Sequence, residues 1–275
     1  MKKLLLGIAA VCLAGFTFAQ DAPLWMRHSV ISPDGTTIAF TYKGDIYTVP
    51  VAGGRAMQIT TNPAYDTAPV WSPDSKRIAF ASDRMGSLDV YIVAKDGGEP
   101  RRLTTHSGSE TPLAFTDAGH VLFSAGIMPS AEAVVFPSNG QFNQVYRVSV
   151  EGGRPTMISS MPMECISINK EGAMLYQDKK GYEDYWRKHH VSPIARDIWM
   201  YTPGKEPQYR QLTTFGGEDR EPVWAPDGKT FYYLSEENGS FNIYRRTPGD
   251  AKAVQLTHYT KNPVRYLSAA TDGKI

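Results

Sequence analysis

Residues 68–104 read APVWSPDSKRIAFASDRMGSLDVYIVAKDGGEPRRLT, a run of short apolar segments separated by turn residues. The first two segments, 68–71 and 77–81, flank the turn Ser72-Pro73-Asp74-Ser75. Proline presets φ at the second position of such a turn, and serine and aspartate side chains bond nearby backbone amides. A third segment, 88–93, alternates in polarity, and a glycine pair then leads to a fourth that ends in Leu-Thr. The stretch therefore predicts four antiparallel strands joined by tight turns.

This phrase occurs five times along the chain. Its turn carries an acidic residue in each copy, and a sixth turn begins near the end of the sequence: Asp34, Asp74, Asp117, Glu171, Asp227 and Asp272. Periods of about 40 residues are typical of β-propeller blades. A β-sandwich also alternates short strands with turns, but it predicts no copying of one four-strand unit. The copies favour radial stacking, in which each blade buries its faces against its neighbours.

We therefore predict an all-β fold, a β-propeller with five complete four-stranded blades and the first strand of a sixth, at residues 264–269. Two arrangements account for this count. A six-bladed ring truncated within blade six is favoured, because the sequence begins a sixth turn and then stops. In the alternative, the last strand pairs with blade one and closes a five-bladed ring.

The first nineteen residues resemble an export signal. Lys2 and Lys3 precede an apolar stretch at residues 4–18, and Ala19 supplies a small residue at a cleavage site. The apolar stretch is shorter than the roughly 20 residues that span a bilayer. We predict a signal peptide over residues 1–19, a propeller domain over residues 20–275, a periplasmic or otherwise exported location, and no stable membrane insertion after cleavage.

Cysteine content and charge point to no particular chemistry. Cleavage would remove Cys12 and leave Cys165 without an intramolecular partner, so we expect Cys165 in the core. A formal net charge of +1 gives no electrostatic case for nucleic-acid binding. The sequence has no Gly-x-Ser-x-Gly elbow, no His-Glu-x-x-His and no phosphate-binding glycine loop. We expect no catalytic residue and no cofactor in this chain.

Two long loops, at residues 125–142 and 178–196, are expected on one face of the ring, and loops on rigid scaffolds carry function. The second contains Trp186 and Arg187, residue types enriched at binding hot spots. His189 and His190 follow, but adjacent side chains in an extended segment point apart, so no metal site is expected. These four residues are candidate contacts for a peptide or partner; a loop that folds back to cover the ring is an equal interpretation.

Asp219 and Arg220 lie just before Pro222-Val223-Trp224 and are expected at the mouth of the central channel. One interpretation is local pairing of Arg220 with Asp219 or Glu221 at the surface, worth about 0–1 kcal/mol. The other is recognition of a peptide terminus or backbone. Both residues are therefore included among the candidate contacts.

The phrase from Trp71 to Thr104 resembles the repeat of TolB-type propellers, over nearly all of the exported portion. The segments Tyr182-Glu183-Asp184, 186–190, 195–199 and 217–220 resemble the N-terminal propeller of bacterial tricorn protease homologues. That resemblance implies a six-bladed propeller, then a seven-bladed one, a PDZ domain and a catalytic region with a serine nucleophile and a histidine. It also implies that the propellers gate the access of unfolded peptides.

The resemblance implies that this chain is the non-catalytic propeller portion of an exported tricorn-like serine peptidase. Its expected partners are peptides or unfolded proteins and other domains or subunits of the same peptidase. A stand-alone periplasmic propeller of the TolB kind, acting as a protein-binding scaffold, is the alternative. A third hypothesis is the propeller of a prolyl oligopeptidase, which demands an α/β-hydrolase domain after the blades.

Overall fold

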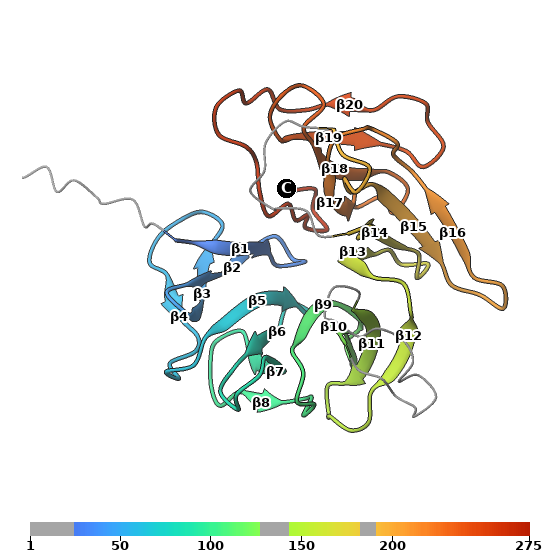
Figure 1. Cartoon of the computed structure of the whole chain (residues 1–275). Helices are drawn as coiled ribbons and strands as arrows, with labels where there is room; N and C mark the ends of the chain where they lie inside the picture. Colours follow the sequence, from blue (N-terminus) through green and yellow to red (C-terminus); the bar gives the residue numbers. More distant parts are fainter. Residues whose placement is uncertain (1–24, 127–142, 182–190) are drawn as a thin grey trace, which may run out of the picture.

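The computed structural model describes residues 25–126, 143–181 and 191–275, in which five four-stranded antiparallel sheets form a ring (Figure 1). Blades one and two comprise β1 (Arg27–Ile31), β2 (Thr37–Tyr42), β3 (Asp45–Pro50), β4 (Met57–Gln58), β5 (Asp66–Trp71), β6 (Arg77–Ser82), β7 (Asp89–Ala94) and β8 (Arg101–Arg102). Blades three to five comprise β9 (Glu110–Asp117), β10 (His120–Ala125), β11 (Gln144–Ser149), β12 (Thr156–Ser159), β13 (Met163–Ile168), β14 (Met174–Asp178), β15 (Ile198–Thr202), β16 (Gln208–Gln211), β17 (Asp219–Trp224), β18 (Phe231–Ser235), β19 (Asn242–Arg246) and β20 (Val254–Gln255).

Each sheet follows chain order, and its first strand lies nearest the centre of the ring (Figure 1). The all-β propeller with five four-stranded blades is thus confirmed. The first strands β1, β5, β9, β13 and β17 contact one another in sequence around the centre. Each blade is consequently a simple meander that runs from the centre of the ring to its rim.

In blade one, the acidic residue of the turn stabilises that turn through side-chain hydrogen bonds. Ser32 donates its hydroxyl hydrogen to Asp34 Oδ1 at 2.6 Å, and the same carboxylate oxygen accepts the Thr36 amide at 3.0 Å. Gly35 follows with φ of +70°, which glycine adopts without steric cost. Blade two repeats the contact, with 2.6 Å between Ser72 Oγ and Asp74 Oδ1. The Ser-Pro-Asp phrase therefore encodes the first hairpin of a blade.

A second repeated contact joins the start of the third strand to the Leu-Thr ending. Thr213 Oγ1 accepts the Ile198 amide at 2.9 Å and donates to Asp197 Oδ1 at 3.5 Å. Blades one, two and five contain an equivalent contact: Ile46 amide to Thr60 Oγ1 at 3.0 Å, Val90 amide to Thr104 Oγ1 at 2.9 Å, and Ile243 amide to Thr257 Oγ1 at 2.9 Å. In each of these blades the threonine hydroxyl therefore satisfies the backbone amide near the start of the third strand.

Successive blades pack face to face through apolar clusters, and tryptophan links some of them. One cluster joins Ala39 and Ile46 of blade one to Trp71 and Phe80 of blade two. Trp71 also donates its indole hydrogen to the Val30 carbonyl oxygen at 3.0 Å. Similar clusters join blades two and three, three and four, and four and five. Each blade therefore buries its faces against neighbours rather than within itself.

The innermost strands share a bulge. A residue with positive φ interrupts the pairing in four of them: His28, Ala68, Cys165 and Glu221, with φ between +50° and +52°. Cys165 is exposed, so its assignment to the core was wrong. The extra residue of a bulge is left out of the ladder, and in blade four that residue is Cys165.

Residues 264–275 lie between blades five and one (Figure 1). The Val264 amide donates to the Phe241 carbonyl oxygen at 2.9 Å, and the Thr271 amide donates to the Pro33 carbonyl oxygen at 2.9 Å. No strand is assigned to residues 264–269. The first strand of a sixth blade is therefore not confirmed as a paired strand.

Candidate functional site

A group of five charged side chains gathers where blades four and five meet. We call it the charged cluster: Glu164, Lys179, Arg196, Glu218 and Arg220. Arg196 Nε lies 3.1 Å from Glu164 Oε2, and Arg196 Nη1 lies 3.5 Å from Glu218 Oε1. Arg220 Nε lies 2.6 Å from Glu218 Oε2, and Lys179 Nζ lies 3.5 Å from Glu164 Oε1. The carboxylates thus alternate with the cations and bind the two blades together.

The fold brings these side chains together from four separate segments. Glu164 is on β13, Lys179 follows β14, and Arg196 precedes β15. Glu218 and Arg220 come from the connection into β17 and from β17 itself. The Glu218 side chain is fully buried, and the Arg220 side chain is 2% exposed. Arg220 also lies over the Phe241 ring, with its guanidinium carbon 5.1 Å from the ring centroid.

The surroundings of the acidic groups set their charge. Burial opposes ionisation of Glu164, but nearby Arg196, Gln177 and Lys179 outweigh it and hold the pKa of this carboxyl below its usual range. Burial also opposes ionisation of Asp219, and there it prevails and raises the pKa to about 7, although hydrogen bonds from Ser235 and Thr213 oppose the shift. Glu164 is therefore ionised at neutral pH, whereas the nearby Asp219 titrates near neutrality.

Two of the predicted contact residues are placed by the structure. Asp219 and Arg220 are on the innermost strand β17, and both are 2% exposed. The interpretation of Arg220 as paired at the surface is wrong, because Arg220 is buried, with Glu218 Oε2 2.6 Å from its Nε. A role in peptide recognition remains a prediction. Trp186, Arg187, His189 and His190 lie outside the described residues.

The two chain segments that flank residues 182–190 are fastened to each other. Lys180 Nζ donates to the Ala195 carbonyl oxygen at 2.7 Å and to Asp197 Oδ2 at 2.5 Å. Asp178 Oδ1 accepts the Asp197 amide at 2.8 Å. These contacts adjoin the charged cluster, because Lys180 directly follows Lys179 in the chain. Both ends of this loop are therefore held in place on blade four.

Sequence reasoning missed the roles of Glu164, Lys179, Arg196 and Glu218. The partners Glu164 and Arg196 are separated by 32 residues, and their proximity depends on how one blade folds back on itself. A local signal existed for Glu218, because it stands two positions before Arg220 on an extended segment and can share its face. The others needed the three-dimensional arrangement.

The described part of the chain offers no group of three His, Cys, Asp or Glu side chains suited to a metal ion. No helix in that part is both long enough and apolar enough to traverse a lipid bilayer. The charged cluster joins two blades through its ion pairs, and its Glu164 and Lys179 side chains are partly exposed.

Repeated four-stranded blades, each with an acidic residue in its first turn, define a β-propeller domain. A family model described as Tricorn protease N-terminal beta propeller domain matches residues 23–275. The chain belongs to this family.

Individual relatives agree with the family assignment. Tricorn protease homolog 1 of Streptomyces coelicolor is 25% identical over 254 residues, which cover 92% of this chain and 22% of that protein. The uncharacterized peptidase YuxL of Bacillus subtilis is 30% identical over 231 residues, which cover 83% of this chain and 31% of that protein. The chain thus spans less than a third of each of these curated relatives.

Solved structures share the fold. The crystal structure of the tricorn protease matches with a TM-score of 0.72 at 18% identity, over 90% of this chain and 24% of that chain. The putative TolB from Agrobacterium tumefaciens matches with a TM-score of 0.64 at 15% identity, over 84% of this chain and 79% of that chain. Both matches show that this chain shares its fold with these two proteins.

Proposed function

We propose that this chain is the propeller portion of an exported tricorn-like serine peptidase, in which it binds or gates peptide substrates and supports assembly with the other domains or subunits. The observation that carries the proposal is the family match over residues 23–275, together with relatives that are peptidases. The nucleophile and its base would be supplied by another part of the peptidase.

We place the peptide contact on the face that carries the blade-four loop, residues 178–196. Trp186, Arg187, His189 and His190 would touch the peptide. The fastened stems at residues 178–180 and 195–197 support this assignment, because a loop with fixed ends presents its side chains at a lower entropic cost. The burial of Asp219 and Arg220 favours a supporting role for these two residues at the base of the same face.

Fluorescence anisotropy with a labelled, permanently unfolded polypeptide tests this function. The chain should bind the polypeptide without cleaving it. Replacing Trp186 and Arg187 by alanine should weaken binding about tenfold or more, since such side chains dominate contact energies. Met85→Ala is the matched control, because Met85 is 66% exposed on blade two. Turnover that a serine-directed inhibitor blocks would contradict the non-catalytic assignment. If the chain with alanine at positions 186 and 187 binds the polypeptide as tightly as the Met85→Ala control, the contact does not lie on this loop.

A stand-alone TolB-like scaffold is the second candidate, favoured by a structural match that covers 79% of a TolB chain. The intact mass of the mature native protein distinguishes the two. A mass far above that of a single propeller supports the peptidase, whereas a mass near that of one propeller supports the scaffold. N-terminal sequencing of the same sample tests export, since cleavage after Ala19 leaves Gln20 as the first residue.

A further inference from the structure

Buried carboxyl groups meet at three of the blade junctions. A backbone hydrogen bond crosses each of these junctions, from the amide of an acidic residue to a carbonyl oxygen of the preceding blade: Asp66 to Gly44 at 2.7 Å, Glu110 to Leu88 at 2.7 Å, and Asp219 to Arg196 at 3.0 Å. An aspartate directly follows each acceptor in the chain. The bond therefore brings two acidic residues together, and we call them the junction carboxyl pairs: Asp45 with Asp66, Asp89 with Glu110, and Asp197 with Asp219.

Most of these carboxyls are buried and short of hydrogen-bond donors. Asp66, Asp89 and Glu110 are fully buried. Asp219 is 2% exposed. Asp66 Oδ1, Asp89 Oδ1 and Asp219 Oδ1 accept no hydrogen bond from the part of the chain that the structure describes. A buried polar atom left without a partner costs about 1–3 kcal/mol, and a proton on one carboxyl of a pair supplies the donor that the other lacks.

A cation lies beside each pair. The contacts are Arg84 Nη2 to Asp66 Oδ2 at 2.8 Å, Arg102 Nη2 to Asp89 Oδ2 at 2.8 Å, and Lys180 Nζ to Asp197 Oδ2 at 2.5 Å. Further polar groups around the pairs are neutral or acidic: Gln58, Thr60, Tyr91, Thr104, Asp178, Gln211, Thr213, Tyr233, Ser235 and Glu237. One positive charge beside two carboxyls favours the ionisation of one of them rather than of both.

The surroundings raise the pKa of a carboxyl in every pair. Burial, the largest cause, raises the pKa of Glu110 and that of Asp219 to about 7. Burial also raises the pKa of Asp45 and that of Asp197 above their ordinary value. The charge of the partner carboxylate adds to the pKa shifts of Asp45, Glu110 and Asp219. Each pair therefore has a member that keeps its proton more readily than an exposed carboxyl does.

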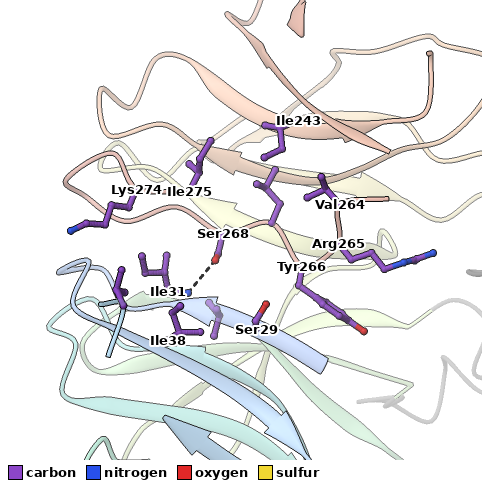
Figure 2. Close-up of a pocket in the computed structure, with 13 residues that line it drawn as sticks. Ser29, Ile31, Ile38, Ile243, Val264, Arg265, Tyr266, Ser268, Lys274 and Ile275 are labelled. Carbon is purple, nitrogen blue, oxygen red and sulfur yellow. Dashed lines mark hydrogen bonds between the residues drawn. The ribbon is translucent and has the colours of Figure 1, made fainter. Parts of the chain in front are cut away.

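Two other junctions have uncharged residues at these positions. Between blades three and four, β13 begins at Met163, where β5, β9 and β17 begin at acidic residues, and β11 begins at Gln144. After blade five, the Val264 amide donates to the Phe241 carbonyl oxygen at 2.9 Å, and Figure 2 shows Val264 among apolar side chains. Asn242 follows that acceptor. The carboxyl pairs are therefore an addition to the blade repeat and not a requirement of it.

We propose that each junction carboxyl pair holds one proton between its two side chains, and that opening of the junction releases this proton. All three pairs lie beside a connection between second and third strands, on the face that carries the blade-four loop. Between about pH 5 and 7 a closed junction keeps a proton that an open junction gives up. Opening should therefore become about tenfold easier for each pH unit in this interval, and no easier above it. This face of the ring is thus a pH-sensitive element that is tightest in mild acid.

Native-state hydrogen exchange of the full chain between pH 5 and 8 measures the opening of the junctions. The amides of Glu110 and Asp219 form junction hydrogen bonds, so their exchange reports on two separate junctions. Their protection factors, which are corrected for the effect of pH on exchange chemistry, should fall about tenfold for each pH unit up to about pH 7. Protection factors that stay constant with pH would overturn the proposal.

Two variants assign the effect to particular pairs. Glu110→Gln should abolish the pH dependence at its own amide and leave that of the Asp219 amide unchanged, and Asp219→Asn should do the reverse. Asp96→Asn is the matched control, because the Asp96 side chain is 71% exposed, and it should alter neither amide. Each junction is a complete test, so one variant suffices if the other does not fold. Loss of the pH dependence at both amides in either variant would refute opening at single junctions, in favour of unfolding of the whole ring.

Carbon-13 NMR of the Glu110 side chain distinguishes a shared proton from burial alone. In the native chain this carboxyl should titrate near pH 7. Asp89→Asn should lower the midpoint, because the charge of the partner no longer opposes ionisation. An unchanged midpoint would mean that Glu110 keeps its proton through burial alone, and the pair would then share nothing.

Discussion

Replacing Glu110 by glutamine should make the stability of the propeller less dependent on pH. Glu110 begins β9 and is fully buried, with its amide donating to the Leu88 carbonyl oxygen at 2.7 Å. Burial raises its pKa from 4.5 to about 7; a hydrogen bond from Thr104 opposes this shift, whereas the nearby carboxylate of Asp89 adds to it. Asp89 in turn lies 2.8 Å from Arg102 Nη2.

The sign of the effect follows from proton binding. Below pH 4.5 the carboxyl is protonated in both the folded and the unfolded chain. Between about pH 4.5 and 7 the folded chain keeps a proton that the unfolded chain releases, so the free energy of unfolding falls as the pH rises. At about 1.4 kcal/mol for each pH unit, the loss from this one group amounts to about 3 kcal/mol, as an order of magnitude.

Urea denaturation followed by tryptophan fluorescence, at pH 5 and at pH 8, measures the effect. Glutamine carries no charge at either pH, so Glu110→Gln should lose about 3 kcal/mol less than the native chain between the two conditions. Glu99→Gln makes the same chemical change at an exposed position and should leave the difference unaltered. If Glu110→Gln loses as much stability as the native chain, Glu110 does not titrate as argued.

Three further substitutions test the repeated contacts. Trp71→Phe removes the indole hydrogen bond to the Val30 carbonyl and should lower the free energy of unfolding by about 1 kcal/mol, measured by urea denaturation. Thr213→Val leaves the buried amide at the start of β15 without its acceptor and should cost about 1–3 kcal/mol, whereas Thr213→Ser should retain most of the stability. Gly35→Ala imposes a Cβ at φ of +70° that would lie 2.5 Å from Asp272 Oδ2, and it should cost about 1–2 kcal/mol and lower the melting temperature. A melting temperature equal to that of the native chain would contradict the close approach of the two turns.

The fold was predictable because its units are local. A turn with an acidic residue and a polar-hydrophobic-aromatic strand recur in each copy, and the contacts they make, such as Ser72 with Asp74, span only a few residues. Strand period and turn chemistry were enough to assign all five sheets. The side chains that join one sheet to the next were not predictable in this way.

The candidate site was less predictable because some of its partners lie on different blades, as Arg196 of blade four and Glu218 of blade five do. Arg220 was expected to pair with Asp219 or Glu221 at the surface, yet it is buried, with Glu218 and Phe241 of its own blade against it. Cys165 was assigned to the core from its residue type, but a bulge turns it out of the packed faces. Both errors concern residues of the innermost strands, which face the centre of the ring. The alternation of residues along the sequence does not show which of their side chains are buried there.

Neighbouring blades share four apolar clusters, and each cluster takes its side chains from two sheets. A cavity made in one cluster should therefore weaken two blades at once. Because no blade has a core of its own, the stability of each sheet depends on the sheet beside it, and a local defect should spread from blade to blade.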